Sequence, residues 1–122
     1  MEIIDDSRLS LARALRELAD GSSEATLRSA LSRSYYSIFH AANVLFGKVS
    51  HADIAKRVGS VDPRLGARIE KLQQLRSQAD YDPHFVEREF GGDLELFRIE
   101  VQKRVEEGRA VFRRLESELG TR

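Results

Sequence analysis

One stretch of the sequence, residues 26–46 (TLRSALSRSYYSIFHAANVLF), constrains the fold more than any other. At about 100° per residue, its large apolar side chains fall on one broad half of a helix. These side chains are Leu27, Leu31, Tyr35, Ile38, Ala42, Leu45 and Phe46, with the small residues Ala30, Ser34 and Ala41 along the edge. We therefore predict that Thr26 to Phe46 is the central helix of an all-helical domain.

The opposite half of this predicted helix is polar but almost uncharged. It carries Ser29, Ser32, Arg33, Tyr36, Ser37, His40 and Asn43, and no charged residue occurs between Arg33 and Lys48. In a chain that is 33% charged, this pattern indicates a surface covered by another helix, a second subunit or a ligand cleft. The alternative is an ordinary buried helix whose hydroxyls bond back to its own backbone.

Length and composition limit the class of protein. The 122 residues suit a single domain, residues 1–122, that buries a core without staples. The absence of Cys excludes disulfides, thiolate nucleophiles and Cys-ligated zinc. The first residues, MEIIDDSRLS, do not resemble a signal peptide, and no apolar run approaches the roughly 18 residues of a membrane span. We expect a cytoplasmic protein with no membrane segment.

Charge is balanced overall but unevenly distributed along the chain. Lys+Arg and Asp+Glu both number 20, so no global attraction to nucleic acid is expected. Residues 26–76 hold nine basic and three acidic residues, whereas residues 77–100 hold two basic and seven acidic ones. This asymmetry indicates either an electric field across the molecule or a set of solvated helix faces.

The first predicted helix precedes the central one. It runs from Asp6 or Ser7 to Ala19, with Asp5, Asp6 or Ser7 as the cap, and it ends at Asp20-Gly21. Ser22 or Ser23 then caps the central helix, which ends near Gly47. The sequence therefore predicts two consecutive helices joined by a short turn.

In the second half of the chain, the sequence predicts one short helix and two long ones. The connection 48–62 contains a short helix, His51 to Val58, closed by Gly59. Asp62-Pro63 is typical of a helix start, and that helix continues to Tyr81 before Asp82-Pro83. After Gly91-Gly92, Asp93 caps a last helix with helically spaced apolar residues, Leu94, Phe97, Val101, Val105, Phe112, Leu115 and Leu119. We predict an antiparallel bundle of four main helices plus a short extra helix.

Arg76 lies in the segment LRSQADYDPHF, residues 75–85. Helical spacing places it within roughly 40° of the inward stripe formed by Leu65, Ile69 and Leu72. An inward guanidinium is costly unless it is paired. Its expected partners are Asp80 at i+4, or polar groups on the Tyr36/His40 side of the central helix.

Two interpretations of Arg76 follow from this position. In the structural one, an Arg76–Asp80 pair ties two helices together. In the functional one, the guanidinium forms a cationic site beside Tyr81 and His84, where a phosphate binds.

The two segments together resemble a known family. SALSRSYYSIFHAANVLF and the later LRSQADYDPHF are similar to the HEPN domain, in particular to small prokaryotic proteins with SRxYYxxFHAA and RxxADY segments. The resemblance covers residues 7 to 119 and implies a bundle of four or five helices that is usually dimeric. Many HEPN proteins are metal-independent endoribonucleases, and many are toxins encoded beside a minimal nucleotidyltransferase that acts as antitoxin.

The resemblance assigns roles to individual residues. HEPN ribonucleases use an Arg, then four to six residues, then a His, and Arg76 matches the Arg. Tyr81 follows after four intervening residues and His84 after seven, so the His is displaced. The resemblance implies Arg76 and His84 as catalytic residues and Tyr81 as a candidate for modification with AMP. It also implies binding roles for Asp80 and for an inner polar layer that receives Arg76, formed by Arg33, Tyr36 and His40.

Three function classes remain open. The first is a HEPN ribonuclease toxin, in which a ribose 2′-hydroxyl attacks the adjacent phosphate, His84 or His40 transfers protons, and Arg76 stabilises charge. The second is a non-catalytic module that presents the same cleft to a nucleotide or a nucleotidyltransferase partner, and the third is a structural homodimer module. No cofactor is expected, and the three His residues, His40, His51 and His84, lack the spacing of metal ligands.

Overall fold

The computed structural model describes residues 2–21 and 23–120, and every regular element in this part of the chain is a helix. None of these helices is long and apolar enough to cross a membrane. The predicted all-helical class is confirmed. The helices are α1 (Glu2–Asp20), α2 (Glu24–Phe46), α3 (Ile54–Gly59), α4 (Pro63–Tyr81), α5 (Phe85–Phe90) and α6 (Leu94–Gly120).

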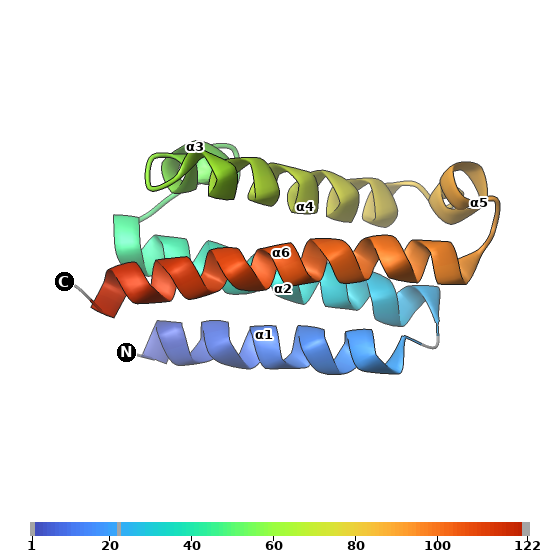
Figure 1. Ribbon diagram of the computed structural model, residues 1–122, viewed down its shortest axis with the longest axis horizontal. Coiled ribbons are helices and arrows are strands. Elements are labelled where there is room, and N and C mark those ends of the chain that lie inside the picture. Colours follow the sequence, from blue (N-terminus) through green and yellow to red (C-terminus); the bar gives the residue numbers. More distant parts are fainter. Residues whose placement is uncertain (1, 22, 121–122) are drawn as a thin grey trace.

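The four long helices, α1, α2, α4 and α6, lie side by side along the long axis of the molecule, with α3 and α5 at opposite ends (Figure 1). The chain reverses direction between each long helix and the next (Figure 1). Helix α2 packs against α1, α3, α4 and α6. Its predicted central position is therefore confirmed.

The apolar half of α2 supplies the middle of the core. Its large side chains, such as Leu31 and Ile38, are fully buried. They pack in one cluster with apolar residues of α4 and α6, which include Ile69, Leu72, Phe97, Val101, Val105 and Leu115. Burial of this continuous cluster is the main favourable term in the free energy of folding.

The uncharged side of α2 is partly covered by the chain's own helices, since Ser37 is buried and the other six residues of this side have intermediate exposure. Ser34 and Ser37 are both buried. The Ser37 hydroxyl donates to the Ser34 carbonyl oxygen at 2.7 Å, as expected for a buried helix whose hydroxyls bond back to the backbone. The Ser10 hydroxyl of α1 donates to the Arg33 carbonyl oxygen at 2.8 Å. This face thus serves first to pack helices together.

A glycine allows α6 to approach α2 and α4 closely. A Cβ atom on Gly108 would lie 2.7 Å from the Ser34 Oγ atom and 3.1 Å from the Leu72 Cδ2 atom. Both distances are shorter than ordinary van der Waals contact. The three long helices therefore meet at a point where only a residue without a side chain fits.

Several predicted helix ends are confirmed. The Ser23 hydroxyl accepts from the Thr26 N–H group at 3.1 Å and caps α2, which ends before Gly47 at φ 79°. The Asp62 carboxylate accepts from the Arg64 N–H group at 3.0 Å, with Pro63 in the first turn of α4. The alternative cap, Ser22, lies outside the described residues. Local capping chemistry was thus sufficient to predict these ends.

The start of α1 was predicted wrongly. The helix begins at Glu2, so the expected caps Asp5, Asp6 and Ser7 lie inside it. Ser7 is fully buried. Acidic residues are favourable near a helix N-terminus as well as at the cap itself, because both positions interact with the helix dipole. Their presence therefore did not locate the first residue.

The short helices also differ from the prediction. Helix α3 begins at Ile54 rather than at His51. Helix α5 was not predicted, and it ends at Phe90, just before Gly91, which adopts a left-handed conformation with φ 61°. Phe85 and Val86 of α5 are buried, and α5 packs on α6. Six-residue helices are unstable alone, so tertiary packing rather than local sequence determines them.

We predict that Gly108→Ala lowers the free energy of unfolding by about 1 to 2 kcal/mol, because overpacking at the Ser34 contact outweighs the better helix propensity of Ala. Urea unfolding measures this change. The double variant Ser34→Ala/Gly108→Ala is the control, since it removes the clashing hydroxyl and should recover most of the loss. Equal stability of Gly108→Ala and the parent would contradict the close approach of α2 and α6.

Candidate functional site

Arg76 is the point at which the two segments singled out in the sequence meet. Its guanidinium carbon lies 5.0 Å from the ring centroid of Tyr35 and 5.1 Å from that of Tyr36. Its Nη2 atom donates to the Tyr36 hydroxyl at 3.5 Å, and its Nε atom lies 3.8 Å from the Asp80 Oδ2 atom. Only 20% of the Arg76 side chain is exposed. The predicted inward direction of Arg76 is confirmed.

The contacts of Arg76 are dominated by the two tyrosine rings. Both polar distances are long, and the buried Nε atom makes no hydrogen bond to the described residues. The Tyr35 and Tyr36 rings meet edge to face, with centroids 5.5 Å apart, so they offer two aromatic surfaces to one cation. Arginine stacks well on aromatic faces because its guanidinium is planar and weakly hydrated. The site is therefore a cation–aromatic cluster rather than a tight Arg–Asp bridge.

His51 belongs to the same cluster, although no role was predicted for it in a site. Its ring stacks on Phe39 with centroids 4.0 Å apart and planes 8° apart. Its Nδ1 atom lies 2.6 Å from the Tyr35 hydroxyl oxygen. The one available signal was chemical: a buried tyrosine hydroxyl usually needs a hydrogen-bond partner. The connection between α2 and α3 thus forms one wall of the site.

Hydrogen bonds hold this connection in place. The Val49 N–H group donates to the Asn43 Oδ1 atom at 2.7 Å, while the Asn43 amide donates back to the Phe39 carbonyl oxygen at 2.9 Å. The Gln73 side chain of α4 donates to the His51 carbonyl oxygen at 3.2 Å. The polar side of α2 therefore orders the loop that carries His51.

Tyr35 remains a neutral hydrogen-bond donor at physiological pH. Burial raises the pKa of Tyr35 to about 12, the Arg76 cation partly opposes this change, and Tyr36 adds to it. The protonated hydroxyl can therefore donate to an unprotonated Nδ1 atom of His51 at 2.6 Å. The cluster combines a cation, a phenol donor and an imidazole, which are groups suited to binding a phosphate or transferring a proton.

The two remaining residues of the predicted inner layer, His40 and Arg33, have different surroundings. His40 stacks on the Tyr36 ring with centroids 5.9 Å apart, so it borders the Arg76 cluster. Arg33 instead forms an ion pair with Glu17 of α1 at 2.5 Å. Within residues 2–21 and 23–120, no contact joins Arg33 to Arg76. Its predicted place in the layer that receives Arg76 is therefore corrected to the α1–α2 interface.

Tyr81 and His84 lie at the exposed end of α4 and the start of α5. Tyr81 is 83% exposed, and the His84 side chain is 78% exposed, with its Nδ1 atom 3.7 Å from the Glu87 Oε2 atom. In the described part of the chain, no hydrogen bond or ion pair joins either residue to Arg76. One chain therefore brings Asp80 and Tyr36 to Arg76, but not His84.

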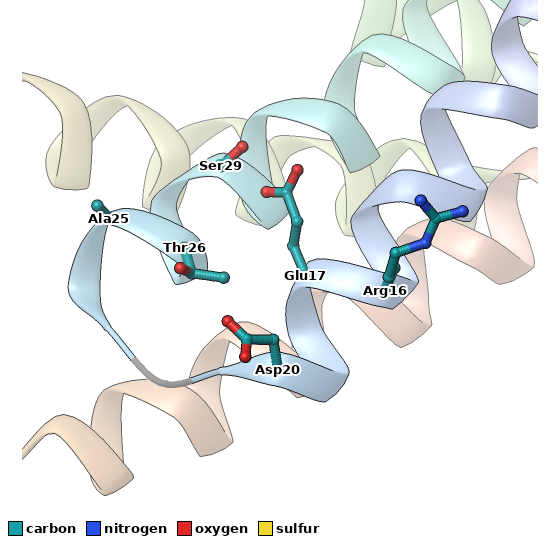
Figure 2. Close-up of a pocket in the computed structure, with 6 residues that line it drawn as sticks. All are labelled: Arg16, Glu17, Asp20, Ala25, Thr26 and Ser29. Atoms are coloured by element: carbon teal, nitrogen blue, oxygen red, sulfur yellow. The ribbon is translucent and has the colours of Figure 1, made fainter.

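A separate hollow of about 460 Å³ lies between the end of α1 and the start of α2. Figure 2 shows Glu17 and Asp20 of α1 beside Thr26 of α2 at this corner. Glu17 is already paired with Arg33. Among the described residues, no three His, Asp or Glu side chains gather where they could hold a metal ion. This hollow lies apart from the Arg76 cluster, since none of its lining residues contacts Arg76.

Comparisons of the chain with protein-family models, with curated proteins and with solved structures find no match. The geometry offers one partly buried cationic cluster on α2 and α4, and one exposed Tyr–His segment at the α4–α5 turn.

We predict that Arg76→Ala lowers the free energy of unfolding by about 1 to 3 kcal/mol, because the two cation–aromatic contacts and the packing of its stem are lost. This is less than the roughly 3 to 5 kcal/mol of a fully buried broken pair, since Asp80 is distant and partly exposed. Thermal and urea unfolding measure the change. Arg68→Ala, on the same helix and without an ion pair in the described chain, is the control. Equal effects of the two substitutions would contradict the cluster.

We predict that alkaline pH selectively removes the stabilisation that Tyr35 provides. The unfolded phenol titrates near pH 10, whereas the pKa of folded Tyr35 is about 12. Between these values only the unfolded state releases the proton, so stability falls as pH rises, by at most about 3 kcal/mol from this group. Urea unfolding of the parent and Tyr35→Phe at several pH values tests this. Their difference in stability should shrink above pH 10, and a constant difference would contradict the buried hydroxyl.

Proposed function

We propose that this chain is a HEPN-like domain of the toxin type, an endoribonuclease that needs no metal and whose site lies near Arg76 in the cleft of a homodimer. One observation carries the proposal: the two segments on which the resemblance rests contact each other, with the Arg76 guanidinium on the rings of Tyr35 and Tyr36. The arrangement of four long helices and two short ones is consistent with the bundle that the resemblance implies.

The proposed reaction is transesterification of RNA. A ribose 2′-hydroxyl loses its proton to a base and attacks the adjacent phosphorus, and the 5′-oxygen leaves with a proton from an acid. The products are a 2′,3′-cyclic phosphate and a 5′-hydroxyl. In this scheme Arg76 stabilises the negative charge that develops on the phosphate oxygens, and His84 transfers protons, because imidazole gains and loses protons near neutral pH and phenols do not.

A dimer would bring together groups that lie apart in a single chain. His84 and Tyr81 are exposed at the α4–α5 turn, whereas Arg76 is largely covered. We propose that these turns meet across a two-fold axis, so that two copies of the Arg76-to-His84 segment line one cleft. RNA bound in that cleft would contact both copies. Asp80 orients Arg76, and Tyr36 and His40 form the inner wall on α2.

A minimal nucleotidyltransferase is the partner proposed for regulation. The Tyr81 side chain is 83% exposed, so its hydroxyl is accessible for transfer of AMP. A modified Tyr81 would place a bulky nucleotide beside the proposed cleft and block RNA. A nucleotidyltransferase gene next to this one would support this pairing.

A second candidate function is a non-catalytic HEPN-like module that binds a nucleotide or a partner protein in the same cleft. Two observations favour it. His84 is displaced relative to the ribonuclease motif, and its only ion-pair contact in the described chain is with Glu87. Arg76 already uses two ring faces and a carboxylate neighbour, as a structural cation would.

We predict that the purified protein cleaves single-stranded RNA in the presence of EDTA. His84→Ala should slow cleavage by about a hundredfold or more, because general acid–base catalysis typically contributes that much. Tyr81→Phe should cleave like the parent. Gel analysis of a labelled oligonucleotide, with identification of the cyclic phosphate end, measures both rates.

The His84→Ala variant should fold normally, since the His84 side chain is 78% exposed. Lys103→Ala, on the exposed surface of α6, controls for a general loss of positive charge. No cleavage by the parent, or equal rates for the parent and His84→Ala, would reject the nuclease. The binding module would then be the better assignment.

We predict a homodimer at tens of micromolar, roughly the range in which a stable dimer persists. Light scattering coupled to size-exclusion chromatography gives the mass directly. Introducing a charge at the proposed interface, as in Tyr81→Glu, should shift the protein toward monomer. A strict monomer for the parent would remove the composite cleft, and with it the proposed catalytic mechanism.

A further inference from the structure

A second polar pocket lies at the corner where α2 ends and α3 begins. Its volume is about 360 Å³, which lies in the lower part of the range of about 300 to 1,000 Å³ for small-ligand sites. It is lined by Lys48, Val49, Ser50, Asp53, Lys56 and Arg57. We call it the corner pocket, and none of its lining residues contacts Arg76.

The corner pocket gathers positive charge that the described chain does not neutralise. Lys48, Lys56 and Arg57 all line it, and none forms an ion pair within residues 2–21 and 23–120. Its one carboxylate, on Asp53, accepts from the Ser50 hydroxyl at 3.1 Å. Three cations facing one carboxylate leave an excess of positive charge that attracts an anion.

Arg57 is held in a way that leaves its donors available. Its guanidinium carbon lies 5.3 Å from the ring centroid of Phe46, the last residue of α2. Contact with a ring face uses the flat side of the guanidinium, whereas its N–H groups point outward in the plane. These coplanar donors suit the oxygens of a phosphate group.

The walls of the pocket are ordered before any ligand binds. The Val49 N–H group donates to Asn43 at 2.7 Å, and the Asp53 N–H group donates to the Ser50 carbonyl oxygen at 3.1 Å. Helix α3 is fixed closely on α4, because a Cβ on Gly66 would lie 2.7 Å from the Ala55 carbonyl oxygen. An ordered backbone lowers the conformational cost of binding, although the exposed side chains of Lys48 and Lys56 still lose freedom when they bind.

A purely structural role for these cations is the main alternative. Lys56 and Arg57 lie in the last turn of α3, and Lys48 follows the end of α2. Cations at helix C-termini interact favourably with the helix dipole. That role would explain each residue separately, but it does not require all three to line one pocket. A structural role predicts that neutralising these side chains lowers the stability of the protein. An anion site predicts that it weakens the binding of an anion.

We propose that the corner pocket binds a phosphate group, either of a small phosphorylated ligand or of an RNA backbone. Lysine binds phosphate as a point charge and arginine as a planar donor, and the pocket offers both. These cations are separate from the Arg76 cluster. Phosphate binding in the corner pocket requires neither Arg76 nor RNA cleavage, so the proposal holds even if the protein is not a nuclease.

The test compares Lys48→Gln/Lys56→Gln with Arg13→Gln/Lys103→Gln, which removes the same charge from exposed residues of α1 and α6 that form no ion pair in the described chain. Pyrophosphate binding is measured by calorimetry. Binding of a fluorescein-labelled single-stranded RNA of about a dozen nucleotides, a length near the site sizes of single-strand-binding proteins, is measured by anisotropy at several salt concentrations. Lys48→Arg/Lys56→Arg should keep parental binding, because the charge remains.

We expect the Lys48→Gln/Lys56→Gln variant to bind about tenfold or more weakly at low salt, and the control within about twofold of the parent. For RNA, the slope of log affinity against log salt should fall by about 0.7 for each lost phosphate contact. Weakening with both ligands, or with pyrophosphate alone, supports a site for small phosphates, and weakening with RNA alone supports a backbone contact. Binding equal to the control, no binding by the parent, or a lowered melting temperature with unchanged binding would overturn the proposal.

Discussion

The stacking of the Arg76 guanidinium on two tyrosine rings is the contact on which the organisation of the site depends. A cation removed from water needs compensation, and here Tyr35 and Tyr36 provide most of it while Asp80 provides charge at a longer distance. The contact joins α2 to α4 across the bundle. It therefore fixes the relative position of the two segments on which the proposed function rests.

Residues next to this contact hold the connection between α2 and α3 in place. The Tyr35 hydroxyl bonds to His51, Asn43 holds Val49, and Gln73 of α4 reaches the His51 carbonyl. The uncharged side of α2 thus has two purposes: it packs against neighbouring helices and it anchors the connection to α3. The groups to which functions are proposed lie toward the ends of the bundle, with α3 and the corner pocket at one end and α5 with His84 at the other (Figure 1).

Sequence periodicity was sufficient for features that depend on one helix at a time. The inward direction of Arg76 follows from its spacing to Leu72 and Ile69, and Asp62-Pro63 marked the start of α4. Among features that depend on two elements, the Arg76–Tyr36 contact was predicted, but others were missed. The stability of α5 comes from packing on α6, and the role of His51 comes from a tyrosine sixteen residues earlier. Arg33 was misplaced because the polar half of a helix is wide enough to face two neighbours, α1 and α4.

A double-mutant cycle between Arg76 and Tyr36 tests the central contact most directly. The cycle uses Arg76→Met, Tyr36→Leu and the double variant, with free energies of unfolding measured in urea, so that the pairwise term is separated from packing losses. The structure predicts a favourable coupling energy of about 0.5 to 2 kcal/mol, the range of a largely desolvated cation–aromatic pair. Additive effects, within about 0.3 kcal/mol, would show that the guanidinium does not rest on the ring and would contradict the account.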